Sequence, residues 1–232
     1  MVTSTALRHE GWQPGLPESG EALVGEYPGL LDALHERAAP GALVASASGY
    51  VLASPARLPA TPAGPAPAGP APADPAPAGP LARFGLAVAS RHPGAVAVGP
   101  PADRFADGLL DLHHQRLQGA LRYALRHLGE RTSGGTTLLS KQLVQGQLAD
   151  IAQCLAEDGA MPVRRRQGDR AARWRTHERL AGAGSDLLML LGASGFLARP
   201  PVTDLHLAVV TGNVYLHPGA GSTDPGERGA SD

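Results

Sequence analysis

The sequence predicts a mainly α-helical protein: an antiparallel four-helix bundle preceded by a small reduced β element and a Pro/Ala-rich linker. Apolar residues recur with a helical period of about 3.6 from residue 105 onward, whereas short alternating stretches occur before residue 100. Residues 61–80, TPAGPAPAGPAPADPAPAGP, are almost wholly Pro, Ala and Gly. Such a segment cannot join a helix or a sheet ladder, so it separates the two parts of the β element.

The chain divides into five predicted parts because its composition changes at their borders. A short helix is expected to start near Pro28, and a first β-turn is expected at Ser48-Gly49. A second turn at His92-Pro93-Gly94 completes a β element of four short strands. The parts are an N-terminal segment (1–40), the reduced β element (41–60 and 81–102), a disordered linker (61–80), the helical bundle (103–217) and a disordered tail (218–232).

Four helical stretches with short connections make up the predicted bundle. The first carries a stripe of leucines and ends at Gly129. The third is polar at its start and so apolar at its end that this end must be buried on more than one side. The stretches are roughly 105–128, 137–157, 164–191 and a last one capped by Thr203 or Asp204.

The net charge of −1 argues against a surface built for nucleic acid or an anionic membrane. One segment is an exception to this weak charge: the stretch from Arg164 to Arg179 contains seven Arg. These arginines form either a solvated helix face or a patch for phosphates. Cys154 is the only cysteine, so no intrachain disulfide is expected, and its apolar register indicates a core residue. With no signal sequence and no apolar run near about 18 residues, a cytoplasmic protein is expected.

Common catalytic motifs are not indicated. The stretch HHQRLQG, starting at His113, is similar to the His-His-x-x-x-Asp-Gly motif of condensation-type acyltransferases, but Gln118 occupies the Asp position within a helix. The sequence contains neither a phosphate-binding Gly-x-x-x-x-Gly-Lys loop nor a Gly-x-Ser-x-Gly elbow. The histidines lack the spacing of a helical zinc site, so no metal ligands are assigned.

Three motifs stand in order in the helical half: RTSGGTTLLSKQLVQGQLADI, DLLMLLGASGFLA, and a Tyr nineteen residues after the Phe of that second stretch. In order and spacing they resemble motifs of the acyl-CoA dehydrogenase family. Within RTSGGTTLLSKQLVQGQLADI, Arg131 and Gln142 are separated by the family's eleven positions, and the family's Leu-Ala-Asp follows at Leu148 to Asp150. The stretch DLLMLLGASGFLA is similar to the family's Gln-x-x-Gly-Gly-x-Gly-Phe turn through Gly192 and Gly195. A Tyr stands nineteen residues after that turn's Phe, as in the family's Tyr-Glu-Gly motif.

The resemblance implies the fold of the family's C-terminal helical bundle with a truncated β domain. It also implies FAD as cofactor, an acyl thioester on CoA or on a carrier protein as substrate, and a homo- or hetero-oligomer. Arg131 and Gln142 would contact the cofactor in a neighbouring subunit, and Gly192 and Gly195 would lie beside it. Met189 and Ala193 depart from the family's Gln and second Gly.

The family's catalytic base is missing from its two usual positions. The Glu of Tyr-Glu-Gly is replaced by Leu216, and the alternative position in the first bundle helix holds Phe105. Asp103, Asp107 and His217 are the neighbouring groups that could substitute. Two functions remain: a degenerate FAD-dependent oxidoreductase acting on the CH–CH group of an acyl thioester, or a non-catalytic scaffolding homologue that pairs with an active subunit.

Overall fold

A computed structural model describes residues 27–58, 81–90, 94–160, 169–192, 195 and 201–218. The described chain is mainly helical, as predicted, with two small antiparallel sheets. The predicted linker at 61–80 and the turn residues His92 and Pro93 lie outside the described residues, as does the predicted tail beyond Pro218.

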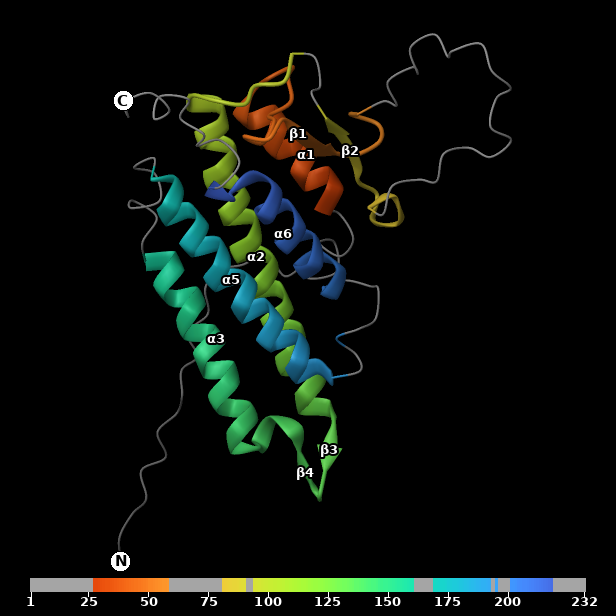
Figure 1. The fold of residues 1–232 in the computed structure, drawn as a ribbon. Coiled ribbons are helices and arrows are strands. Elements are labelled where there is room, and N and C mark those ends of the chain that lie inside the picture. Colours follow the sequence, from red (N-terminus) through yellow and green to blue (C-terminus); the bar gives the residue numbers. More distant parts are fainter. Residues whose placement is uncertain are drawn as a thin grey trace, which may run out of the picture.

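Helices α2 and α5 form the centre of the molecule and run side by side in the same direction (Figure 1). Helix α3 packs against one side of this pair, and α6 packs against the other side. Helix α1 lies against α2 near the β element. The bounds are α1 (Tyr27–Ala38), α2 (Pro100–Glu130), α3 (Gln142–Ala160), α5 (Arg170–Leu191) and α6 (Val202–Tyr215).

Helix α2 is longer than its periodicity predicts because it begins at Pro100-Pro101. Proline is well suited to the first helical turn, where its missing N–H is not needed. After α2, the chain forms a hairpin of β3 (Thr132–Ser133) and β4 (Thr136–Thr137) and the short 3₁₀ helix η2 (Leu138–Ser140). This hairpin occupies the start of the predicted second helix, so α3 begins later than expected.

Helix α6 starts without the predicted side-chain cap. Pro201 occupies the N-cap position, and no side chain accepts a hydrogen bond there. The Asp204 carboxylate instead lies buried against Arg116, whose Nη1 is 3.3 Å from Asp204 Oδ2. The capping role expected for Thr203 or Asp204 is therefore wrong, because a tertiary ion pair takes the only carboxylate in this turn.

The β element pairs strands from the two sides of the predicted linker. Strand β1 (Tyr50–Ala53) is antiparallel to β2 (Ala87–Ser90), with Tyr50 opposite Ser90. A single parallel bridge joins Val44 to Val96. The 3₁₀ helix η1 (Ala82–Phe84) precedes β2. Four strands were predicted, whereas the described residues form one strand pair and one bridge in this element.

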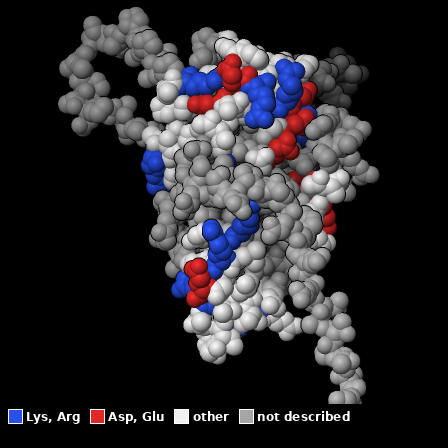
Figure 2. Space-filling model, turned by 180° about the vertical axis from the view of Figure 1, so that it is seen from behind, with Lys and Arg blue, Asp and Glu red and all other residues white. Residues whose placement is uncertain are grey.

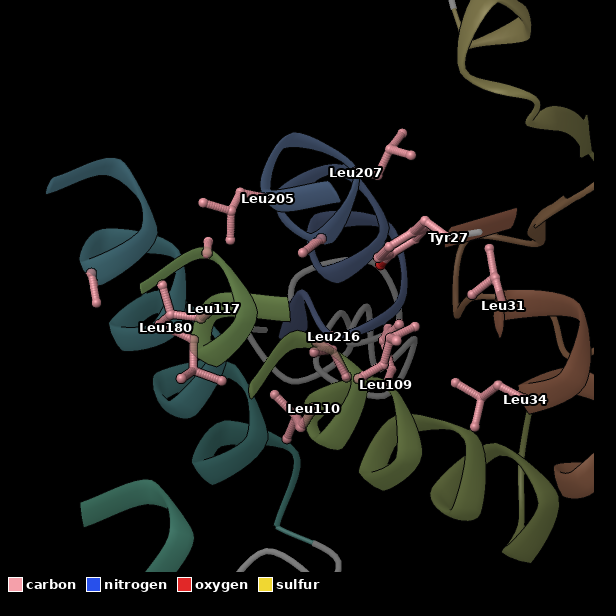
Figure 3. Packing of buried hydrophobic residues seen from close by; sticks show 14 of the residues in the cluster. Tyr27, Leu31, Leu34, Leu109, Leu110, Leu117, Leu180, Leu205, Leu207 and Leu216 are labelled. Atoms are coloured by element: carbon pink, nitrogen blue, oxygen red, sulfur yellow. The ribbon is translucent and has the colours of Figure 1, made fainter. Parts of the chain in front are cut away.

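Leucine and alanine side chains from all five helices fill one continuous core in the described chain, part of which is drawn in Figure 3. A buried histidine attaches the β element to this core. His35 Nδ1 accepts a hydrogen bond from the Val44 amide at 3.0 Å, and His35 Nε2 donates to the Leu52 carbonyl at 2.9 Å. The Leu52 amide donates to the Tyr215 hydroxyl at 2.8 Å, so α1 and α6 both hold the same strand.

On the described part of the face in Figure 2, blue and red side chains lie side by side in the upper part and again lower down, whereas one blue group at the left edge stands apart. Among the described residues, one ion pair joins Arg57, which follows β1, to Glu36 of α1. Neighbouring charges of opposite sign keep the field of such a surface weak at a distance.

We expect the stability of the fold to fall as the pH drops from about 6.5 toward 4. Burial lowers the pKa of His35 to about 4, whereas an unfolded histidine titrates near about 6.5. Between these values the unfolded state binds a proton that the folded state does not, so acid favours unfolding, by on the order of 3 kcal/mol. Urea denaturation at pH 7.5 and pH 4.5 measures this difference.

A His35→Gln variant should show a smaller pH dependence, because its side chain does not titrate. A Leu125→Gln variant, at an exposed site, removes no titratable group and should keep the wild-type pH dependence. An unfolding free energy that does not change over this pH interval would contradict the expectation.

Candidate functional site

A cavity lies where the β element meets the N-terminal ends of α2 and α5 and the C-terminal end of α6. Its volume is about 260 Å³, and we call it the Leu216 cavity. Small apolar residues of the β element line one side. The side chains used in the argument below are Asp103, Phe105, Arg170, Arg173, Tyr215 and Leu216.

Phe105 and Leu216, the two positions at which the family resemblance expects a base, line this same cavity. Their exposed fractions are 1% and 2%, so both are packed rather than displayed to solvent. The Phe105 ring packs against two aromatic neighbours, with its centroid 4.5 Å from that of His35 and 4.7 Å from that of Tyr215. The two positions therefore contribute apolar and aromatic packing and no proton acceptor.

Asp103 and Asp107, the carboxylates nearest to Phe105, are both held by Arg173 of α5. Arg173 Nη1 donates to Asp103 Oδ1 at 2.6 Å, and Nε donates to Asp107 Oδ1 at 2.8 Å. Burial alone would lower the pKa of Arg173, but its hydrogen bonds to Asp107 and Asp103 raise it above the usual value. Because a fixed guanidinium occupies their oxygens, these carboxylates fit a structural ion-pair network better than a general base.

The Arg-rich segment divides into two kinds of residue at α5. Arg170, Arg175 and Arg179 are exposed, in agreement with a solvated helix face, whereas Arg173 is buried in the network described above. Residues 164–166 of the segment lie outside the described chain. The sequence shows the number of arginines but not which of them points inward.

His217, the third substitute considered for the base, lies against α5. Its ring packs edge-on against Trp174, with centroids 4.8 Å apart and an interplanar angle of 74°. The residue is exposed, and it follows Leu216 directly. This contact gives the imidazole a packing role at the surface.

Arg131 and Gln142 lie at the opposite end of the helices from the Leu216 cavity. Arg131 follows the last residue of α2 and its carbonyl accepts a 2.7 Å hydrogen bond from Leu138 across the hairpin. Its Nη1 is 3.2 Å from His127 Nε2 on the protein surface. Gln142 is the exposed first residue of α3, so the hairpin brings both residues to one end of the molecule.

Gly192 and Gly195 both have local reasons to be glycine. Gly192 ends α5 with a φ of 57°, in the left-handed region that other residues avoid. A Cβ added to Gly195 would overlap the carbonyl oxygen of Leu188. The backbone of this turn therefore requires both glycines without any ligand, and Ala193 lies outside the described residues.

The positions that the resemblance assigns to the base and to the cofactor contact lie far apart within one chain. Phe105 lies near the start of α2 and Arg131 just beyond its end, which at about 1.5 Å per residue places their backbones about 40 Å apart. One flavin cannot contact both. The Leu216 cavity is also smaller than the about 300–1,000 Å³ that pockets for drug-sized ligands have. The family's arrangement would need the Arg131 end of a second chain.

A second polar cluster was not expected from the sequence. The Tyr27 hydroxyl lies 3.1 Å from His113 Nε2 and 2.5 Å from Thr211 Oγ1, which joins α1, α2 and α6 inside the core. His177 of α5 packs against His113, with ring centroids 5.5 Å apart. Burial lowers the pKa of both histidines, so both are neutral imidazoles near pH 7.

The sequence contained one signal for this cluster. His113 belongs to the His-His pair that resembles an acyltransferase motif, and it falls on the leucine stripe of the first predicted helix. The second member, His114, points toward α3, where its Nδ1 lies 2.8 Å from the buried Asp158 carboxylate. The two rings thus serve different helix contacts, and the pair does not form one catalytic site.

No protein family, no curated protein and no solved structure matches this chain.

The described helices include none that is long and apolar enough to cross a membrane. Within the same described residues, no three His, Cys, Asp or Glu side chains gather to hold a metal ion. Cys154 is half-buried against the core, and burial raises the pKa of its thiol.

We expect the restoration of a carboxylate at the family position to damage the fold. A Leu216→Glu variant places an ionisable group in a packed site, which should lower the free energy of unfolding by about 3 kcal/mol. A Leu216→Met control keeps volume and polarity and should cost less than about 1.5 kcal/mol. Urea denaturation of both variants tests this, and equal stability of Leu216→Glu and wild type would contradict the packing described here.

Proposed function

We propose that this chain is an acyl-CoA dehydrogenase-like protein that has lost the dehydrogenation step and acts as a non-catalytic, associating homologue. The observation that carries the proposal is that Phe105 and Leu216 line one cavity. These two positions were assigned to the family's alternative bases from the sequence alone, at sites far apart in the chain. Their meeting at one place supports the resemblance, and their apolar side chains support the loss of catalysis.

The order and direction of the helices also support the proposed relationship. Helices α2, α3, α5 and α6 alternate in direction along the chain, and a hairpin separates the first two. The resemblance calls for this sequence of elements in a four-helix bundle of acyl-CoA dehydrogenase type. Arg131 and Gln142, which it assigns to a contact with a neighbouring subunit, flank the hairpin.

The proposed association surface is the end of the helices near this hairpin. Leu143, the second residue of α3, is 76% exposed, and Met189, near the end of α5, is 67% exposed. Because α3 and α5 pack in opposite directions, these two side chains lie at the same end. Two exposed apolar side chains at one end of the molecule support a contact there with a second copy or a related subunit.

The second candidate function is a FAD-dependent oxidoreductase acting on an acyl thioester carried by CoA or by a carrier protein. The exposed Arg131 favours it, since a guanidinium at a chain contact could bind the diphosphate of a flavin held mainly by the neighbour. In that arrangement the chain would supply cofactor contacts to a partner. The missing base makes this the weaker candidate for the isolated chain.

We expect purified protein that has been incubated with FAD and desalted to show no flavin absorbance in the visible range. The physical reason is that the Leu216 cavity is too small for the ring system and Arg131 is remote from it. Retained flavin absorbance that disappears in an Arg131→Ala variant would contradict the primary proposal and favour the second candidate.

We also expect the chain to associate through the hairpin end. Light scattering should show an oligomer for the wild type and a monomer for a Leu143→Lys, Met189→Lys double variant, because two charges would then be buried at the contact. Val98 is 79% exposed at the other end of the molecule, so a Val98→Lys control should remain oligomeric. A wild-type protein that stays monomeric at the highest concentration tested would refute the association.

A further inference from the structure

A second cavity lies between α2, α5 and α6, and we call it the Leu180 cavity. Its volume is about 210 Å³. Leu117 of α2, Leu180 of α5 and Leu205 of α6 line it, and their side chains are labelled in Figure 3. Each of the three is 5% exposed or less, so packed aliphatic side chains form the walls of the cavity.

The space exists because small residues stand where α5 and α6 face it. Ala181 and Gly184 of α5 and Ala208 of α6 line the cavity. A Cβ added to Gly184 would lie 3.8 Å from Leu205 Cδ2 and 4.0 Å from Leu117 Cδ1, which is ordinary van der Waals contact. A methyl group would therefore fit between two of the cavity walls without a clash.

The lining offers no partner to a charged ligand. No Asp, Glu, Lys or Arg side chain is among the described residues that line the cavity. His113 and His177 form part of the wall, and burial lowers the pKa of both, so both rings are neutral near pH 7. Their Nε2 atoms already have partners, in Tyr27 for His113 and in Asn213 for His177. Most of the wall is apolar.

The cavity reaches the surface between α5 and α6. Ser185 of α5 and His206 of α6 line it and are both exposed. Leu117 and Gly184 line it as well and are buried, so the cavity extends from the surface into the core. A small molecule can therefore enter from solvent between these two helices.

We propose that the Leu180 cavity binds a neutral apolar molecule about the size of one aromatic ring. Such a ring would cover leucine side chains from three helices at once, and the burial of apolar surface favours its binding. An apolar cavity of about 150 Å³ holds benzene, so 210 Å³ also admits a ring with one methyl group. This inference does not depend on the proposed loss of dehydrogenation and concerns a different part of the fold from the Leu216 cavity.

The first test compares benzene with pyrazine on the full chain by calorimetry. The two rings have similar size, but pyrazine carries nitrogen acceptors at opposite ends, so at least one of them must lie inside the cavity. An acceptor that loses water without gaining a donor is costly, so benzene should bind saturably, 1:1 and at least about tenfold more tightly than pyrazine. Absence of saturable benzene binding, or equally tight binding of pyrazine, would overturn the proposal.

NMR of the leucine methyl groups locates the bound ring. An aromatic ligand shifts the resonances of the side chains that it contacts, so benzene should move the methyl signals of Leu117, Leu180 and Leu205. Leu143 is 76% exposed at the hairpin end, and its signals should stay in place. If benzene moves only leucine signals from outside the cavity lining, the assignment of the site is wrong.

Two glycine variants provide a matched comparison. Gly184→Ala adds a methyl group to the cavity, whereas Gly182→Ala adds it at an exposed position of α5 that does not line the cavity and has nothing within 4 Å. Alanine favours a helix over glycine, so both variants should fold. Gly184→Ala should weaken toluene binding relative to benzene by about three- to tenfold, because room for the ligand's methyl group is lost, and Gly182→Ala should behave as wild type. The same toluene affinity in both variants would contradict binding at this site.

Discussion

The packing of Phe105 against His35 and Tyr215 is the contact on which the rest of the structure depends. The three rings come from α2, α1 and α6, and His35 and Tyr215 both bond the backbone of Leu52 in β1. The reduced β element has a single strand pair and a bridge to hold it together in the described residues. Its attachment to the helices therefore relies on this aromatic cluster.

The same cluster bears on the proposed loss of dehydrogenation. A base at Phe105 or Leu216 would place a carboxylate among buried rings and aliphatic side chains, where a charge is costly. Apolar residues at these positions stabilise the junction of the β element with α2 and α6. A β element with one strand pair and one bridge in the described residues needs that stabilisation, so the observed packing and the proposed ancestral reaction would make opposite demands on the same two positions.

The sequence predicts the helices well because their apolar stripes are local, periodic signals. It fails where a distant partner decides the outcome. The sequence predicts Asp204 to be a helix cap, but its carboxylate binds Arg116. The sequence does not distinguish Arg173 from the exposed arginines around it, but its guanidinium binds Asp103 and Asp107. The pairing of β1 with β2 and the Tyr27–His113–Thr211 contacts join segments far apart in the chain, so no local pattern could reveal them. The motif spacing assigned Arg131 and Gln142 to a cofactor contact in a neighbouring subunit, and the fold shows only that both lie at the hairpin end, far from the Leu216 cavity.

The central claim is that this chain keeps the helices of an acyl-CoA dehydrogenase-like protein without its reaction. Mass spectrometry of acyl-CoA and acyl-carrier thioesters incubated with the protein, FAD and an electron acceptor tests it most directly. The account predicts no α,β-unsaturated thioester above the level of a protein-free control. Protein-dependent formation of a product that is lighter by two hydrogens, at a rate that rises with protein concentration and requires FAD, would contradict it.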